Sequence, residues 1–181
     1  MCLILFAYDY HPKYKLVLAS NRDEFYNRPT LPAGFWQDHP YILAGRDLKE
    51  GGTWLGITTS GRFAALTNYR DPSRNKKNAP SRGHLVSDYL AGTMTPSAYI
   101  ENLPERGEAY NGFNLLIGDC TSLYYYSNRQ QVLRKLVPGI YGLSNGLLDD
   151  PWPKVVKGKK QLQTALQNEE VDAQQLFAIM A

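Results

Sequence analysis

Cysteine and histidine are scarce in this sequence. The 181 residues include only two cysteines, Cys2 and Cys120, and three histidines, His11, His39 and His84. Two cysteines cannot form a disulfide framework, and neither a Cys-x-x-Cys pair nor a His/Cys cluster with the spacing of zinc ligands is present. We therefore expect no metal site and no cofactor.

Long apolar runs and an excess of one charge are also missing. The first apolar run, residues 2–7, is too short for a signal peptide, and no stretch reaches the length of a membrane span. We therefore expect no membrane span and a cytoplasmic location. The net charge is only +3, which indicates no nucleic-acid partner. The densest basic stretches, residues 70–77 and 154–160, are expected to be solvated surface, with a phosphate contact as the alternative.

The composition is typical of a globular protein, with 43% hydrophobic and 20% charged residues. The length favours a single domain over residues 1–181 with a sizeable core. Short alternating apolar runs predict strands, the first two of which are joined by a hairpin connection at residues 9–13. The predicted strands cover residues 3–8, 14–19, 41–44, 53–58, 62–67, 113–117, 122–126, 131–136 and 140–143.

Capping signals predict helices in two groups. The predicted helices cover residues 81–91 with Ser81 as N-cap, a short segment opened by Thr95 and Pro96, a segment from Asp150 and Pro151 to about residue 168, and residues 171–180. The order of strands, helices, strands and helices predicts an α+β fold of antiparallel sheets and helices. The Pro- and Gly-bearing segment 27–52 is predicted to be a functional loop or lid.

Cys2 is the first candidate functional residue. Because a small second residue favours removal of Met1, we expect the mature chain to begin with Cys2. An α-amino group has a pKa of roughly 7.7–8.0, so it can accept the proton of the thiol beside it. The alternative is an inert, buried cysteine at the start of a strand.

The stretch Asn-Arg-Asp-Glu that follows the second strand is the next candidate. The predicted hairpin folds residues 20–23 back beside Cys2. A guanidinium from Arg22 would favour the thiolate there, and the carboxylate of Asp23 could hold a protonated amine. A turn stabilised by an Arg–Asp pair explains the same residues equally well.

Two asparagines stand at other predicted strand ends. Asn68 follows the strand at residues 62–67, and Asn145 follows the strand at residues 140–143. An asparagine amide at such a position can donate a hydrogen bond to the oxyanion that develops in acyl transfer. A simple turn asparagine is the alternative for each.

These residues and the blocks around them resemble the NRDE family, also called the transport and Golgi organisation family. The tetrapeptide that names the family is Asn21 to Glu24 here. The blocks cover nearly the whole chain in the family's order. They read MCLILFAY, LVLASNRDEFYNRP, AGRDLKEGGTWLGIT, GRFAALTNYRDP, SRGHLVSDYL, YNGFNLLIGD and GLSNGLLDDPWPKV.

The resemblance implies an N-terminal-nucleophile hydrolase-like fold, a four-layer αββα sandwich similar to cysteine-type amidases and acyltransferases such as bile-salt and penicillin V hydrolases. It implies that Cys2 is the nucleophile and that Arg22 and Asp23 neighbour it. Asn68 resembles the oxyanion-hole asparagine, and Asn145 the later asparagine that orients the amine and substrate.

The chain departs from the pattern of the amidases at one place and from that of the family at another. The amidases carry a separated Arg and Asp where this chain has the tetrapeptide, so Asn21 or Glu24 could take part, and we assign both as candidate substrate-binding residues. Family members also continue into a final strand block with Tyr-Gly-Thr-Arg, whereas this chain stops at Ala181. We therefore expect a C-terminally incomplete chain, with a family member that lacks the final strands as the alternative.

The function implied is hydrolysis or acyl transfer at a non-peptide C–N amide of a small-molecule substrate, through an acyl intermediate on Cys2. The alternative is a non-catalytic protein that uses the same pocket to bind or traffic haem, an acyl-lipid or acyl-CoA. The sequence is also compatible with assembly into a homo-oligomer.

Overall fold

The structure is a computed structural model in which residues 2–181 are described. The expected removal of Met1 concerns a residue outside that range. Residues up to Asp23 together with Val137–Ala181 form one compact unit, and Glu24–Leu136 form the other. Each unit combines an antiparallel sheet with helices, so the predicted α+β class is confirmed.

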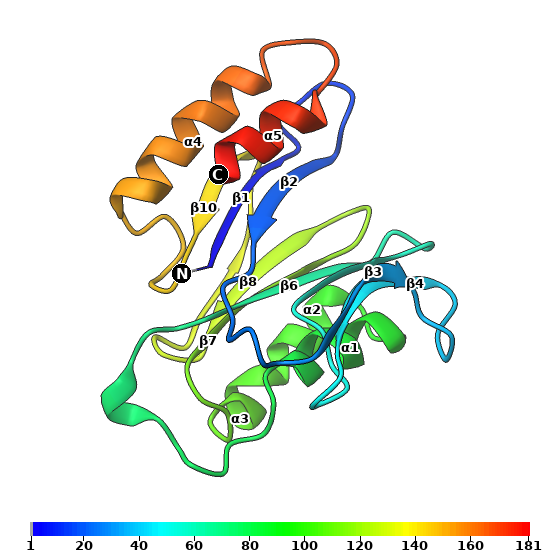
Figure 1. The fold of residues 1–181 in the computed structure, drawn as a ribbon, viewed down its shortest axis with the longest axis vertical. Helices are drawn as coiled ribbons and strands as arrows, with labels where there is room; N and C mark the ends of the chain where they lie inside the picture. The colour runs from blue at the N-terminus through cyan, green and yellow to red at the C-terminus, as the bar shows by residue number, and fades with distance from the viewer. Residues whose placement is uncertain (1) are drawn as a thin grey trace. The chain divides into compact units, whose positions relative to one another are not determined.

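The first unit is built on a three-stranded sheet with the order β10-β1-β2 (Figure 1). Its strands are β1 (Leu3–Tyr8), β2 (Leu16–Asn21) and β10 (Gly139–Leu143). The central strand β1 begins and ends at the predicted residues, and all six of its residues are buried. Successive residues of a strand point to opposite faces, so a strand that is buried at every residue has an almost continuous apolar sequence.

Helices α4 (Pro153–Ala165) and α5 (Ala173–Met180) cover this sheet (Figure 1). Leu3, Leu5 and Ala7 of β1 share a core with Val155 and Leu162 of α4. The alternate residues of a strand point to one face, so the odd-numbered residues of β1 are the ones that meet the helix. The predicted amphipathic stretch at residues 171–180 corresponds to α5, which contacts β2 and α4.

The second unit is built on a seven-stranded antiparallel sheet with the order β3-β4-β5-β6-β7-β8-β9. The strands are β3 (Thr30–Phe35), β4 (Ile42–Asp47), β5 (Leu55–Thr58), β6 (Phe63–Asn68), β7 (Phe113–Gly118), β8 (Leu123–Ser127) and β9 (Val132–Lys135). A short 3-10 helix η1 (Pro72–Arg74) follows β6, and α1 (Gly83–Ala91), α2 (Pro96–Glu101) and α3 (Leu103–Gly107) precede β7.

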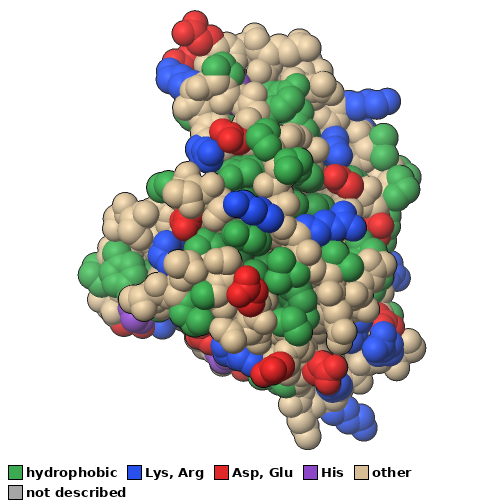
Figure 2. Space-filling view, turned by 180° about the vertical axis from the view of Figure 1, so that it is seen from behind, with side chains coloured by type: hydrophobic (Ala, Val, Ile, Leu, Met, Phe, Trp, Pro, Cys, Tyr) green, Lys and Arg blue, Asp and Glu red, His purple; other side chains and the backbone are tan. Residues whose placement is uncertain are grey.

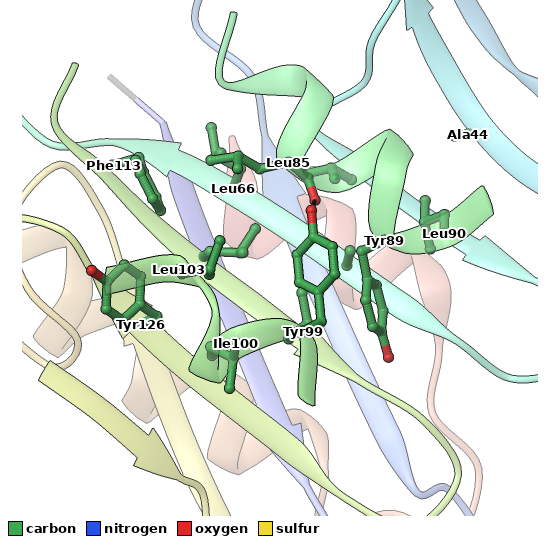
Figure 3. Close-up of a cluster of buried hydrophobic side chains, with 14 of the residues drawn as sticks. Ala44, Leu66, Leu85, Tyr89, Leu90, Tyr99, Ile100, Leu103, Phe113 and Tyr126 are labelled. Atoms are coloured by element: carbon green, nitrogen blue, oxygen red, sulfur yellow. Dashed lines mark hydrogen bonds between the residues drawn. The ribbon is translucent and has the colours of Figure 1, made fainter. Parts of the chain in front are cut away.

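A core rich in tyrosine lies between this sheet and its helices (Figure 3). The rings of Tyr89 and Tyr99 meet edge to face with their centroids 5.2 Å apart. The hydroxyl of Tyr99 donates to the carbonyl oxygen of Leu85 at 2.9 Å, and that of Tyr89 to Gly118 at 2.9 Å. Each buried phenol therefore has an acceptor for its proton, which buried tyrosines require.

Three sequence-based expectations about elements are wrong. The segment 27–52 was predicted to be a loop or lid with a short strand at residues 41–44; that strand corresponds to β4, but the strand β3 that pairs with it was not predicted. The strand β3 lies at the sheet edge and carries Pro32, which is tolerated there because an edge strand leaves some N–H groups unpaired. The helix α1 begins after Arg82, without a side-chain cap from Ser81. The helix α4 begins at Pro153, and Asp150 instead accepts a hydrogen bond from Leu147 N at 2.6 Å.

Acidic and basic side chains are interspersed over the face seen in Figure 2. No helix in residues 2–181 combines the length and apolar character needed to cross a membrane. Within the same residues no group of three or more His, Cys, Asp and Glu side chains is placed to hold a metal ion.

Candidate functional site

Cys2 lies half-buried at the start of β1. In the register of β1 with β2, Leu3 pairs with Asn21, so the chain after β2 returns to Cys2. The backbone N–H of Asp23 donates to Cys2 Sγ at 3.4 Å, and the Sγ to Asp23 O distance is 3.8 Å. The predicted return of this stretch to the cysteine is therefore confirmed.

Three side chains hold the peptide group that joins Cys2 to Leu3. The Leu3 N–H donates to Asn21 Oδ1 at 2.8 Å. On the other side, the carbonyl oxygen of Cys2 accepts from Ser144 Oγ at 2.8 Å and from Lys154 Nζ at 3.0 Å. A peptide held by side chains at both its N–H and its C=O is fixed in orientation, and the Cys2 side chain starts from that fixed backbone.

Ser144 is buried and comes directly after β10. In the antiparallel register of β1 with β10, Ile4 pairs with Leu143. Continuing this register by two residues brings Asn145 level with Cys2, and continuing the β1–β2 register by one residue brings Arg22 level with it on the other side. The neighbouring strands thus lead Arg22 and Asn145 to the same end of the sheet as the cysteine.

Lys154 reaches Cys2 from the first turn of α4, where it follows Pro153. Figure 1 shows the start of β1 beside the connection from β10 to α4. Burial lowers the pKa of the Lys154 amine, while the electrostatic interactions with Cys2 and Asp23 act in the opposite direction. The Nζ atom also lies 5.7 Å from the centre of the Trp152 ring, within the range of a cation–π interaction.

The connection between β10 and α4 is itself anchored by two aspartates. Asp149 adopts a left-handed backbone conformation with φ of 63°. Its Oδ1 accepts from Gly142 N at 2.9 Å and from Lys159 Nζ at 2.7 Å. Asp150 accepts from Leu147 N and so closes the turn inside the connection. These bonds define the path by which the chain leaves β10 and enters α4, and they thereby place the first turn of the helix.

The helix also lies unusually close to the sheet. A Cβ added to Gly142 of β10 would lie 2.6 Å from Val155 Cγ1, and one added to Gly158 of α4 would lie 2.5 Å from Leu5 Cδ1. Only glycine permits these approaches without a shift of the neighbouring atoms. Because Gly158 lies one turn after Lys154, the packing of α4 helps to set the position of the lysine.

The basic stretch at residues 154–160 is not uniformly solvated, contrary to the expectation from the sequence. Lys154 contacts Cys2, and Lys159 is paired with Asp149, whereas Lys157 is exposed. Lys159 and Lys160 line a separate cavity of about 450 Å³ beside α4. Lys154 is therefore the lysine of this stretch that belongs to the candidate site.

The remaining predicted site residues have different surroundings. Arg22 is half-buried, and the side chain of Asp23 is exposed while its backbone meets the sulfur. Glu24 and Asn68 belong to the other compact unit. The Glu24 carboxylate accepts from Phe25 N at 3.0 Å, and Asn68 ends β6 as an exposed residue. The catalytic and substrate-binding roles of all these residues stay predictions.

Sequence reasoning missed Ser144 and Lys154. Ser144 immediately precedes Asn145, so the strand-end pattern had a signal that could have included it. Lys154 is separated from Cys2 by most of the chain. Its one local signal is a positive residue in the first turn of a helix, where the helix dipole favours negative charge.

Solved structures with the N-terminal-nucleophile hydrolase fold match this chain. A Caenorhabditis elegans N-acylethanolamine-hydrolyzing acid amidase ortholog matches with a TM-score of 0.65 and 10% identity, over 98% of this chain and 85% of that one. Penicillin V acylase from Agrobacterium tumefaciens matches with a TM-score of 0.56 and 11% identity, over 98% and 71%. At such low identity the matches show the fold, and they confirm the fold class predicted from the sequence.

Sequence comparisons identify the family. The Transport and Golgi organisation 2 family model matches residues 1–181. The bovine homolog of that name is 46% identical over 173 residues, which are 88% of this chain and 62% of that protein. The mouse homolog is 44% identical over 94% of this chain and 66% of its own length, and the Drosophila melanogaster protein is 35% identical over 90% and 64%. The chain thus spans about two thirds of the length of these relatives. It belongs to the Transport and Golgi organisation 2 family.

Proposed function

We propose that the chain acts as a cysteine-type N-terminal-nucleophile amidohydrolase or acyltransferase on a non-peptide C–N amide of a small molecule. The observation that carries the proposal is the environment of Cys2. Cys2 is half-buried, and the peptide group that joins it to Leu3 is held by Asn21, Ser144 and Lys154. Backbone groups need partners in any protein, but side chains from three separate elements supply them here, and the fixed orientation that results is what a nucleophile requires.

The proposed reaction proceeds through a thioester on Cys2. Once Met1 is removed, the α-amino group of Cys2 takes the thiol proton, and the sulfur attacks the carbonyl carbon of the amide. The C–N bond then breaks, and the amine leaves with that proton. In hydrolysis, water attacks the thioester, the acid is released and the thiol is restored. In acyl transfer, a second amine or alcohol takes the place of water.

The other predicted residues have supporting roles in this proposal. Arg22 would favour the thiolate, and Asp23 would hold the protonated amine. Asn68 and Asn145 are proposed as donors to the oxyanion and to the amine or substrate. Asn21 and Glu24 are proposed to contact the substrate, although Asn21 also binds the Leu3 N–H.

Fold likeness supports the general class of substrate. One of the matching structures is named for the hydrolysis of N-acylethanolamines and another is a penicillin acylase. We propose an N-acyl amide of this general kind as the substrate class of the present chain. Because fold alone does not determine activity, the proposal depends on the chemistry of Cys2.

The experiment has two steps, both read by intact-protein mass spectrometry. The mass of the purified chain first shows whether Met1 is removed. The chain is then incubated with a small activated acyl ester, and the acyl adduct is located and tested for release by hydroxylamine, which cleaves thioesters. The matched variants are Cys2→Ala and Cys120→Ala, since Cys120 is the other, exposed cysteine of the chain.

We expect a hydroxylamine-sensitive adduct in the wild type and in Cys120→Ala, and none in Cys2→Ala. Release of amine from an N-acyl amide should show the same dependence on Cys2. Equal labelling of Cys2→Ala, or retention of Met1 on all molecules, would contradict the proposed mechanism. Tight binding of an acyl compound without any adduct would favour the binding alternative.

A further inference from the structure

Lys154 occupies a position that helix stability does not explain. It is the second residue of α4, directly after Pro153. The N-terminal end of a helix carries partial positive charge, so a lysine there costs up to about 1 kcal/mol relative to an acidic residue. Burial of the amine is a further cost, and it lowers the pKa of Lys154. Some other interaction must therefore offset both effects.

The contact with Cys2 provides that interaction. Lys154 Nζ donates to the carbonyl oxygen of Cys2 at 3.0 Å, alongside Ser144 Oγ at 2.8 Å. The carbonyl carbon is bonded to the Cα of Cys2, which carries both the thiol side chain and, in a chain without Met1, the α-amino group. The ammonium group of Lys154 thus contacts a carbonyl oxygen that belongs to the same residue as the proposed nucleophile and its proposed base.

The positive charge of Lys154 affects both the thiol and the α-amino group of Cys2, and both effects favour a nucleophilic sulfur. A positive charge nearby favours the negative thiolate over the thiol, and it disfavours the positive ammonium form of the amine. Both effects would raise the fraction of Cys2 that has a nucleophilic sulfur at neutral pH. Ser144 binds the same oxygen without carrying a charge, so it can orient the peptide but cannot have this electrostatic effect.

Other charged groups also follow the strands at this end of the sheet. Arg22 and Asp23 follow β2, and Asp150 lies in the connection that leads to α4, where it binds Leu147 N. The Asp23 carboxylate interacts electrostatically with Lys154. Its negative charge opposes the effect of the lysine, whereas Arg22 would reinforce it.

We propose that Lys154 is a positioning residue of the candidate site, which holds the Cys2 carbonyl and through its charge sets the pH range in which Cys2 is nucleophilic. This inference rests on the proposed function, because a nucleophilic Cys2 is what it explains. It adds a residue from α4 to a site that was otherwise assembled from strand ends.

The test measures alkylation of Cys2 by iodoacetamide, a neutral reagent, over the pH range in which thiols titrate. All proteins carry Cys120→Ala, so that Cys2 is the sole thiol. The variants are Lys154→Met, Lys154→Arg, Ser144→Ala and, as the matched control on the same helix, Lys157→Met, which removes an exposed charge. Circular dichroism establishes that each variant is folded before its alkylation rate is compared.

Lys154→Met is expected to move the midpoint of the alkylation profile to higher pH, so that alkylation at a fixed pH below the midpoint becomes several-fold slower. Lys154→Arg keeps the positive charge, so its alkylation midpoint should stay close to that of the protein with Lys154. Lys157→Met should leave the midpoint where it is, and Ser144→Ala, which removes an orienting hydrogen bond but no charge, should move it less than Lys154→Met does. A Lys154→Met profile that coincides with that of Lys157→Met, or a Ser144→Ala shift as large as that of Lys154→Met, would overturn the inference.

The alkylation test does not require turnover. If Cys2 forms no acyl adduct but the Lys154→Met profile still shifts, the proposed function fails while the electrostatic link remains. If Cys2 forms the adduct and the profile does not shift, the role of Lys154 fails while the proposed function stands. The two failures are therefore distinguishable.

Discussion

The close contact between α4 and β1 yields a prediction whose sign depends on one neighbouring residue. A Cβ at Gly158 would lie 2.5 Å from Leu5 Cδ1 and 3.0 Å from Leu5 Cδ2. Non-bonded carbon atoms prefer a separation of about 3.5–4.0 Å. Leu5 is completely buried, so its methyl groups cannot move into solvent to relieve the overlap.

Two opposing effects determine how much Gly158→Ala changes the free energy of unfolding. Gly158→Ala should cost about 1–3 kcal/mol through overpacking against Leu5. It should also gain about 1 kcal/mol because alanine is a better helix former than glycine. We therefore expect a net destabilisation of about 1 kcal/mol in the wild-type background. Leu5→Ala alone should destabilise by about 2–5 kcal/mol, since it leaves a cavity in a fully buried position.

In the Leu5→Ala protein, the effect of Gly158→Ala on the free energy of unfolding should have the opposite sign. Without the Leu5 methyl groups there is room for the added Cβ, so Gly158→Ala should stabilise the Leu5→Ala protein by about 1 kcal/mol. The interaction energy between the two sites is then about 2 kcal/mol, a size typical of residues in direct contact.

Urea unfolding followed by circular dichroism measures these free energies. Gly34→Ala is the control, because nothing lies within 4 Å of the Cβ it would add. It should change the free energy of unfolding little in either background. If Gly158→Ala stabilises the wild type, or if the double variant is additive within about 0.5 kcal/mol, the proposed packing of α4 on Leu5 is wrong.

Three further predictions concern protonation and hydrogen bonding. The bond from Arg46 lowers the pKa of Asp38 to about 2, so this pair supports the fold above roughly pH 4 and loses that support as the pH falls toward 2. In Arg46→Met, a carboxyl NMR titration should find the Asp38 midpoint near its ordinary value, and an unchanged midpoint would exclude this cause. Burial raises the pKa of Tyr89 to about 12, so stability should fall as the pH rises from roughly 10 toward 12. The part of the tyrosinate absorbance that is lost in Tyr89→Phe should appear together with unfolding, and ionisation of Tyr89 in a still folded protein would contradict this. Asn21→Ala should cost about 1 kcal/mol and speed hydrogen exchange at the Leu3 amide, whereas Asn21→Asp, which keeps the acceptor, should preserve its protection.

The strand-borne part of the site could be predicted from the sequence. The apolar run that forms β1 was predicted with its observed bounds, and a hairpin connection returns the end of β2 to its start. Such predictions succeed because hairpin pairing depends on nearby residues and on a simple two-residue period. The register was not predicted, because the predicted strands 3–8 and 14–19 would pair Leu3 with Ala19, whereas the structure pairs it with Asn21.

The helix-borne part could not be predicted in the same way. Asp150 before Pro151 resembles a helix cap, but the Asp150 carboxylate binds Leu147 N, and α4 begins later, at Pro153. The same local pattern suits a tight turn and a helix start, because an aspartate can accept from nearby backbone N–H groups in both. Which of the two forms depends on where the helix must dock. The strand β3 was missed for a comparable reason, since its proline and glycine interrupt the alternation that signals a strand.

The packing of α4 and the proposed role of Lys154 are linked by geometry, and this gives a last prediction. Lys154 and Gly158 are four residues apart on α4, so they lie on one face of the helix. Gly158 permits that face to lie against Leu5, while Lys154 reaches the Cys2 carbonyl at the start of the same strand. If Gly158→Ala lifts the helix, the contact between Lys154 and Cys2 should lengthen. The alkylation midpoint of Cys2 should then move in the same direction as in Lys154→Met, by a smaller amount, and Leu5→Ala should reverse the move. If the midpoint stays constant while the stability changes, the contact between Lys154 and the Cys2 carbonyl does not depend on how α4 packs against Leu5.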